Sequence, residues 1–257
     1  MYKVVFFLIA GALSVYGCSS GGGGGSADPV DWSTLKVFGD GAGVARLVDS
    51  ETGEQGLLIG PNITALVDAA NDDEVDDSIT TFSDFAKVNT LTYSTVREGT
   101  VTVDGTTANV TFYEDRSGIV GIALFEIPGL ARLGLVTGTR MTGNPSGSFD
   151  YVGTHGVRNR TNDAIEIGTF DMTIDFDNNS FTYDGETTSS DLVGTGSVDV
   201  ANARFASSDL SFSTNGYANT ATMRGLLHGE DAEGVSAIFH TNETTPLYDG
   251  AVAGSKK

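Results

Sequence analysis

Three histidines are the side chains of this sequence best suited to hold haem or a metal ion: His155, His228 and His240. No two of them stand at a metal-ligand spacing such as H-x3-H. His228 and His240 flank a predicted hairpin, so their rings could meet across it. We take all three as candidate ligand-binding residues. The alternative is that each is an ordinary surface residue or a satisfied polar group.

Two acidic segments could bind calcium through carboxylate oxygens. The segment from Asp175 to Glu186 places oxygen donors at positions 1, 3, 5 and 12 of a calcium loop, but Ser180 stands where that loop needs glycine. Its flanks alternate like strands, which favours a polar β-turn. In the run from Asn71 to Asp77, like charges held together favour a solvated loop over a site for calcium or a basic partner. We therefore predict no metal site.

The sequence contains none of the short motifs that carry common catalytic chemistry. G-x-S-x-G, H-E-x-x-H, the P-loop and the dinucleotide-binding glycine pattern are all absent. An enzyme would need a paired acid and base, or a nucleophile with its base, and only folding could assemble such a pair here. We predict that the protein is not an enzyme and has no catalytic residues and no cofactor.

The N-terminus has the parts of a secretory signal followed by a single cysteine. Lys3 supplies a positive charge, Val4 to Leu13 form an apolar run, and Cys18 is the one cysteine of the chain. The run is about half the length of a membrane-spanning helix, roughly 20 residues, so it is a poor permanent anchor. Val15-Tyr16-Gly17-Cys18 resembles the lipobox of bacterial lipoproteins, which implies cleavage before Cys18 and lipidation of its thiol. The alternative is an ordinary secretory signal with an incidental cysteine.

A flexible tether follows Cys18. Residues 19–26 are all serine or glycine, a composition that behaves as a flexible coil. Ser19 stands where an aspartate would retain the protein at the inner membrane, which by resemblance to Gram-negative lipoproteins favours the outer membrane. We expect a signal peptide at 1–17, the lipidated cysteine and tether at 18–27, and a domain at the cell surface. The alternative is the periplasmic face of the same membrane.

The chain of 257 residues carries a net charge of −20. Nucleic acid and anionic membrane surfaces would repel such a domain, so we predict no nucleic-acid partner. The charge is compatible with a basic partner, but it also keeps an exported protein soluble. With Cys18 lipidated no disulfide can form, and the fold must depend on its core and its β-ladders.

The second half has the pattern of half-buried strands. From Phe170 to Phe176 apolar residues alternate with polar ones, which places the apolar side chains on one face of a sheet. The apolar residues from Phe170 to Phe176 occupy even-numbered positions, whereas upstream Ile165 and Ile167 occupy odd-numbered ones. This switch predicts a β-bulge at Gly168-Thr169, where an extra residue would bend the strand.

Tight-turn signals divide this half into segments of strand length. Asp184-Gly185 and Asn215-Gly216 suit the left-handed backbone of hairpin turns, as Asp104-Gly105 does in the first half. We count eight strands, about the number that closes a small barrel filled by side chains. They begin near Gly147, Ile165, Ser180, Leu192, Asp209, Thr220, Gly234 and Tyr248.

The first half is also rich in candidate strands, with one short helix expected from Asn62 to Ala70. The strands are expected at 44–48, 55–59, 90–95, 100–104, 108–113 and 119–125. We predict an all-β protein, with a smaller strand-rich, handle-like region at 28–137 and an eight-stranded antiparallel β-barrel at 138–257. The sequence leaves open whether the first half is a separate sheet or an extension of the barrel.

Three segments of the second half resemble the barrel domain of transferrin-binding protein B-like lipoproteins. The segments from Ser146 to Gly153 and from Tyr248 to Lys257 resemble that family's opening and closing strands. The segment from Gly225 to Phe239 matches its signature at Gly229, Ala232, Glu233, Val235 and Phe239. The resemblance covers roughly 138–257. It implies an eight-stranded barrel on a lipid-anchored surface protein that binds a host protein, haem or another solute.

We therefore predict an outer-membrane or surface-anchored lipoprotein that acts as a solute- or protein-binding module, of the class that captures haem, a metal carrier or a host protein. The alternative is a structural envelope lipoprotein without a small-molecule ligand. The expected partners are the membrane, through the lipid on Cys18, an extracellular protein or haem ligand, and an integral outer-membrane receptor. Loops at one end of the barrel would form the site.

Overall fold

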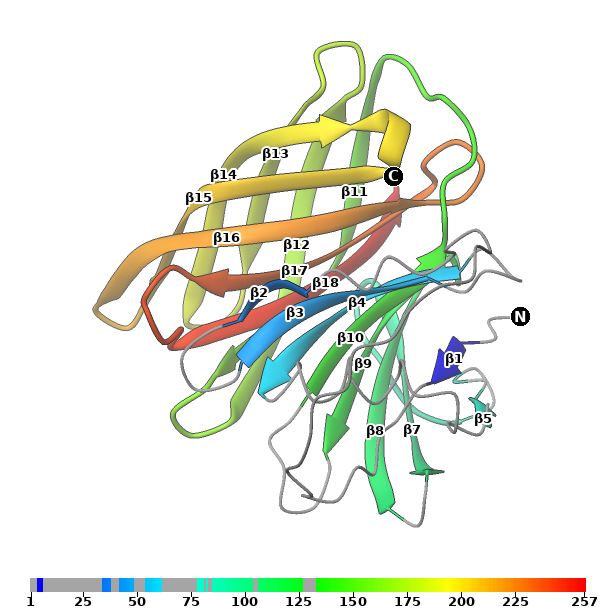
Figure 1. The fold of residues 1–257 in the computed structure, drawn as a ribbon, viewed down its shortest axis with the longest axis vertical. Helices are drawn as coiled ribbons and strands as arrows, with labels where there is room; N and C mark the ends of the chain where they lie inside the picture. Colours follow the sequence, from blue (N-terminus) through cyan, green and yellow to red (C-terminus); the bar gives the residue numbers. More distant parts are fainter. Residues whose placement is uncertain are drawn as a thin grey trace, which may run out of the picture.

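The computed structural model describes residues 4–6, 34–37, 42–48, 54–61, 78–80, 82, 85–103, 106–126 and 133–257. Figure 1 shows two bodies, an open sheet and a barrel. Cys18, the tether, the expected helix at 62–70 and the acidic run at 71–77 lie outside the described residues. Within the described ranges, no helix has the length and apolar character needed to cross a membrane.

The second half forms a closed antiparallel barrel in which each strand pairs with its neighbours in sequence and the first strand pairs with the last. This confirms the predicted eight-stranded barrel. A turn of 3-10 helix, Val200–Asn202, joins two of the strands. The strands are β11 (Ser148–Asn159), β12 (Ala164–Asp175), β13 (Ser180–Glu186), β14 (Ser190–Asp199), β15 (Arg204–Thr214), β16 (Tyr217–His228), β17 (Gly234–Thr241) and β18 (Tyr248–Lys256).

The first half forms an open sheet with the strand order β2-β3-β4-β10-β9-β8-β7-β6. It is thus a separate sheet, although the chain after β10 bonds to the barrel, where Arg140 pairs with His228. A two-stranded sheet joins β1 (Val4–Phe6) to β5 (Ser78–Thr80). The open sheet contains β2 (Thr34–Val37), β3 (Ala42–Val48), β4 (Glu54–Pro61), β6 (Ala86–Thr90), β7 (Ser94–Val103), β8 (Thr106–Asp115), β9 (Val120–Glu126) and β10 (Leu133–Thr139).

One face of the open sheet packs against the barrel wall, and this contact explains why β9 and β17 are buried on both faces. β9 is almost wholly buried because alternate side chains enter the barrel contact and a second cluster around Phe82 on the opposite face. β17 is buried throughout because it faces both the barrel core and the open sheet. The contact joins Leu57, Ile59, Val120, Ile122 and Val136 of the sheet to Leu226, Ile238, Ala251 and Ala253 of the barrel.

The barrel interior is filled by large side chains. Phe170, Phe181, Phe212 and Phe239 are fully buried there, and Tyr151 donates a hydrogen bond to the Ala232 carbonyl at 2.8 Å. Burial of this apolar surface supplies most of the stabilisation, at about 25 cal/mol per Å². A ligand that entered the barrel would have to displace these side chains.

The bulge predicted at Gly168-Thr169 is wrong. β12 pairs with β11 in one unbroken register from Ala164 to Asp175. The parity switch has another cause: Phe170 and its even-numbered neighbours face the core, whereas Ile165 and Ile167 face outward and line an apolar cavity of about 30 Å³ against Ile122 of the open sheet. The two halves of β12 therefore bury opposite faces.

The turn predictions have different outcomes. Asn215 and Gly216 both have positive φ and close a two-residue turn between β15 and β16, as predicted. Asp104-Gly105 lies outside the described residues, between strands that pair up to Val103 and Thr106. The turn predicted at Asp184-Gly185 is wrong, because both residues lie within β13 and the chain turns at 187–189.

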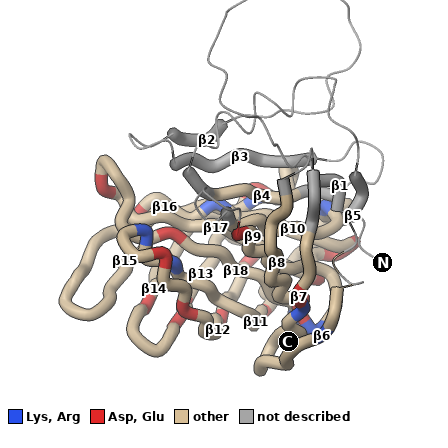
Figure 2. The backbone as a smooth tube through the Cα atoms, turned by 90° about the horizontal axis from the view of Figure 1, so that it is seen from below, with Lys and Arg blue, Asp and Glu red and all other residues tan. Residues whose placement is uncertain are grey.

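The outer wall of the barrel away from the open sheet is acidic, and Figure 2 shows Asp and Glu spread over β12–β15. Asp171 stands directly opposite Asp184, and Glu186 directly opposite Asp191. Like charges opposed across a ladder are destabilising; at Asp171 this cost is offset by Lys257, whose ammonium group donates to the carboxylate at 2.5 Å.

Candidate functional site: the loop rim of the barrel

Four loops meet at one end of the barrel because, in an up-and-down barrel, every second connection returns to the same end. These loops, at 160–163, 187–189, 215–216 and 242–247, are called the rim. The connections at 176–179, 200–203 and 229–233 lie at the other end. Loops on a rigid scaffold are the usual place for binding residues, so the rim is the candidate site.

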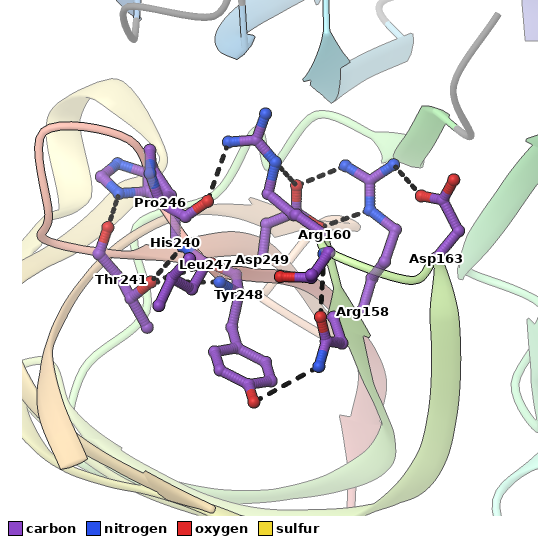
Figure 3. Close-up of polar contacts among 11 residues, drawn as sticks. Arg158, Arg160, Asp163, His240, Thr241, Pro246, Leu247, Tyr248 and Asp249 are labelled. Carbon is purple, nitrogen blue, oxygen red and sulfur yellow. Dashed lines mark hydrogen bonds and ion pairs between the residues drawn. The ribbon is translucent and has the colours of Figure 1, made fainter. Parts of the chain in front are cut away.

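A buried ion-pair network fixes the base of the rim. Asp249 of β18 is 3% exposed and accepts two hydrogen bonds from Arg158 of β11, one from Nε at 2.8 Å and one from Nη2. Arg160 Nε lies 3.8 Å from the same carboxylate, and Asp163 lies 3.9 Å from Arg158. Figure 3 shows Asp249 between the two guanidinium groups. The network ties the first and last strands of the barrel together.

The 242–247 loop is held on both sides of Leu247. The Arg160 amide donates to the Leu247 carbonyl at 2.9 Å, and Arg160 Nη1 donates to the Pro246 carbonyl at 3.2 Å. Thr241 Oγ1 accepts from the amides of Leu247 and Tyr248, both at 3.2 Å. The Leu247 side chain nevertheless remains 40% exposed. A large apolar side chain is thus presented to solvent on a fixed backbone.

Glu166 fixes the 187–189 loop. Its carboxylate accepts hydrogen bonds from Ser189 Oγ at 2.5 Å and from Thr187 Oγ1 at 2.7 Å. These bonds lower the pKa of Glu166, with the Ser189 hydroxyl as the largest cause. The loop is therefore held by an ionised carboxylate at neutral pH.

An aromatic layer lies directly beneath the rim. The ring centroids of Phe212 and Tyr248 lie 5.0 Å apart, and those of Tyr217 and Tyr248 lie 5.2 Å apart. Phe212 is fully buried, whereas Tyr217 and Tyr248 are partly exposed. The rim thus rests on a packed floor, not on an open channel.

His155 lies inside the barrel, on β11. Its Nδ1 lies 2.7 Å from the Tyr183 hydroxyl, and its ring stacks on Phe239 with 5.3 Å between centroids. Burial lowers its pKa to about 3, so the ring is neutral. Gly185 leaves room for this pair, because a Cβ there would lie 2.7 Å from the Tyr183 hydroxyl and 2.9 Å from His155 Nδ1.

His228 lies at the junction between the barrel and the open sheet. Its Nδ1 lies 3.1 Å from the Thr139 carbonyl of β10, and its Nε2 lies 2.7 Å from the Ser236 hydroxyl of β17. Burial lowers its pKa to about 4. The neutral ring is therefore used as a bridge between the two bodies.

The structure does not bring the predicted histidine pair together. His228 pairs with Gly234 and His240 pairs with Thr222, so the two rings lie at opposite ends of the hairpin. Their separation is roughly 20 Å at about 3.4 Å per residue. His240 is 2% exposed, beside the rim, with its Nδ1 3.2 Å from the Thr241 carbonyl. The described residues contain no group of three metal-ligating side chains.

The calcium-like segment forms a turn between β12 and β13. Asp175 accepts hydrogen bonds from the Asn178 amide at 2.9 Å and from its side-chain Nδ2 at 2.7 Å. Asn179 has a φ of 52°, which completes the turn. The carboxylate is thus engaged with the turn itself, as the polar-turn interpretation expects.

The rim residues were not singled out from the sequence. Arg158 and Arg160 are about 90 positions from Asp249, and an isolated Asp reads as a surface residue. One signal was present in the sequence: Arg158 and Arg160 are the only Lys or Arg residues between Arg140 and Arg204. Two cations at the end of a predicted strand in so acidic a chain could have indicated a buried ion-pair network.

No protein-family model matches the sequence, and the search of curated proteins found no match. Solved structures do match. They include structures of transferrin-binding protein B and of HpuA. The barrel segments of the sequence resemble lipoproteins of the transferrin-binding protein B type.

Three examples give the extent of the similarity. HpuA from Kingella denitrificans, solved with human haemoglobin, is 13% identical, with 90% of each chain covered and a TM-score of 0.47. Transferrin-binding protein B from Haemophilus parasuis is 10% identical, with 80% of this chain and 51% of that chain covered and a TM-score of 0.49. The protein from serogroup B Neisseria meningitidis is 10% identical, with 84% and 52% covered and a TM-score of 0.47. The chain spans about half the length of these transferrin-binding protein B structures.

Proposed function

We propose that this chain is a lipid-anchored surface protein that captures a protein ligand outside the cell through the rim. The observation that carries the proposal is the preorganisation of the rim: Glu166 fixes one loop, and the network around Asp249 fixes two others. A loop that is already fixed loses less conformational freedom on binding, which favours affinity.

The filled barrel indicates the size of the ligand. Because side chains such as Phe212 and Phe239 occupy the barrel interior, the ligand would bind at the outer surface of the loops. An outer surface of several loops suits a protein ligand better than a small molecule, since small-molecule sites are concave and bury most of the ligand. The barrel segments that resemble transferrin-binding protein B-like lipoproteins imply a host protein, haem or another solute as the ligand, and a protein ligand is within that range.

The anchor at Cys18 and the tether at 19–26 would hold the rim away from the membrane. Acylation of Cys18 would supply the attachment, at about 0.8 kcal/mol per buried CH2. The test uses Gram-negative cells that carry the full chain, with fluorescent haemoglobin and transferrin as probes and a Cys18→Ala variant as the control for anchoring.

We expect saturable binding of at least one probe to intact cells, lost after protease treatment of those cells and absent with Cys18→Ala. Absence of binding by both probes, or protection of the domain until the outer membrane is opened, would overturn the proposal. Protection would instead support the structural envelope role, because the rim would then face the periplasm.

Leu247 is expected to contribute much of the binding energy at the rim. Its backbone is bonded on both sides and its side chain is 40% exposed, so replacement by Asp should weaken binding of the probe at least tenfold without unfolding the barrel. Binding curves on intact cells measure the effect. Val88→Asp is the matched control, because Val88 is 51% exposed but lies on β6 of the open sheet. Equal losses from both variants would exclude the rim.

A further inference from the structure

The ladder of the barrel is broken at one place on its outer wall. β14 and β15 pair at Val193 with Ser211 and again at Ser197 with Ala206, with a register shift between these pairs. A second shift, between β15 and β16, lies beside it, between Ser207 and Leu210. Bulges of this kind often lie next to binding sites, where they turn side chains out of the regular pattern.

An open groove of about 450 Å³ lies over this break. Thr195 and Ser197 of β14, Ser208 and Asp209 of the bulge, and Arg224 of β16 line it. The groove belongs to the outer wall and shares no residue with the rim. Its lining mixes hydroxyl groups with one carboxylate and one guanidinium group.

The polar groups of the groove are only partly used by the protein. The Ser207 hydroxyl donates to the Thr195 carbonyl at 2.7 Å, and Asn242 donates to the Ser208 carbonyl at 2.8 Å. These bonds replace part of the missing ladder. The side-chain hydroxyls of Thr195, Ser197 and Ser208 make no hydrogen bond within the described part of the chain.

Arg224 is the one cationic residue among those that line the groove. Its Nε is shielded from solvent and has no hydrogen-bond acceptor among the described residues. A ligand oxygen can therefore reach only the terminal Nη1 and Nη2 of Arg224, because a ligand contacts only atoms that solvent can reach. The guanidinium group donates only, so the ligand must supply acceptors.

We propose that this groove binds a carbohydrate chain. Sugar hydroxyls both donate and accept, so one ring can donate to Asp209 and accept from Arg224 and from the free Ser and Thr hydroxyls. A phosphate group or another small anion fits less well, because Asp209 stands in the groove and the surrounding wall is acidic. The proposal does not rest on protein capture at the rim, although Asn242 of the rim is hydrogen-bonded to Ser208 and Thr222 of the groove lining.

The test uses the labelled full chain in a detergent without sugar groups, on an array of neutral N-glycans, sialylated N-glycans and bacterial O-polysaccharides. Binding to one of these classes supports the proposal, and the class identifies the source as a host glycoprotein or a bacterial envelope. Failure to bind all three classes would overturn it.

A pair of arginine variants tests the location. Arg224→Gln is expected to weaken binding of the selected glycan about tenfold, whereas Arg204→Gln should leave it unchanged within about twofold. Arg204 is the matched control because its Nε also has no acceptor, yet it does not line the groove. Ser197→Ala, at an exposed position, is a second groove variant that should not affect folding. Equal effects of the two arginine variants, or full binding by both groove variants, would contradict the proposal.

Discussion

Replacement of Asp249 by Ala is expected to lower the free energy of unfolding by about 3–5 kcal/mol. The carboxylate is 3% exposed and bonds Arg158, which is itself 7% exposed. Removing it leaves a buried guanidinium group without its bidentate partner, and the desolvation penalty of that charge is then no longer offset. Urea unfolding of the full chain in detergent, followed by circular dichroism, measures the change.

Two further variants separate burial from charge. Asp163→Asn should cost at most about 1 kcal/mol, because the Asp163 side chain is 49% exposed and lies 3.9 Å from Arg158, and Asn tolerates the φ of 55° at this position. The double variant Arg158→Met with Asp249→Leu should recover the part of the loss that comes from Arg158, since that buried charge is removed as well, whereas Arg160 still loses its 3.8 Å contact with the carboxylate. A small effect of Asp249→Ala alone would contradict the description of the network as the structural base of the rim.

Acid is expected to destabilise the fold through its two buried histidines. The pKa of His155 falls to about 3 and that of His228 to about 4, against 6.5 for an ordinary histidine. Below pH 6.5 the unfolded chain therefore takes up protons that the folded protein does not. Stability is fully present above pH 6.5 and falls by about 1.4 kcal/mol per pH unit for each histidine until the folded pKa is reached. The combined loss at pH 4.5 is about 5 kcal/mol.

The measurement is the urea midpoint as a function of pH between 7.5 and 4.5, a range in which most carboxylates are still ionised. His155→Phe and His228→Gln should each remove about half of the slope between pH 6.5 and 5. Phe can retain the stacking on Phe239, and Gln can retain a bond to Thr139 or Ser236. A flat profile in the unaltered protein would show that the rings are protonated in the folded state.

The barrel could be predicted from the sequence because its pattern has period two and its turns carry their own signals. Strands expected near Gly147, Ser180, Gly234 and Tyr248 begin within one residue of those positions. The prediction for Asp209 misses the start of β15 by five residues because the bulge after Ser207 interrupts its alternation.

The errors have one physical origin. A local pattern shows which residues of a strand are apolar, but it does not show which element packs against each face of that strand. Ile165 and Ile167 looked like the result of a bulge because their contact with Ile122 comes from a distant sheet. Gly185 looked like a turn residue, whereas it makes room for Tyr183 and His155. In both cases the deciding neighbour is remote in sequence.

The candidate site could be predicted only in outline. Loops at one end of the barrel were expected, but the residues singled out were histidines. His155 and His228 are buried structural groups, and the contacts that fix the rim join Arg158 to Asp249 and Glu166 to Ser189. Such pairings depend on the register of the closed barrel, and local sequence patterns do not predict that register.

Hydrogen–deuterium exchange of the full chain, with and without the protein probe that binds, tests the central claim most directly. Capture at the rim predicts slower exchange in the loops at 160–163, 187–189, 215–216 and 242–247, with no change at the opposite end of the barrel. Protection confined to 176–179, 200–203 and 229–233, or to the open sheet, would contradict the account and place the site elsewhere on the protein.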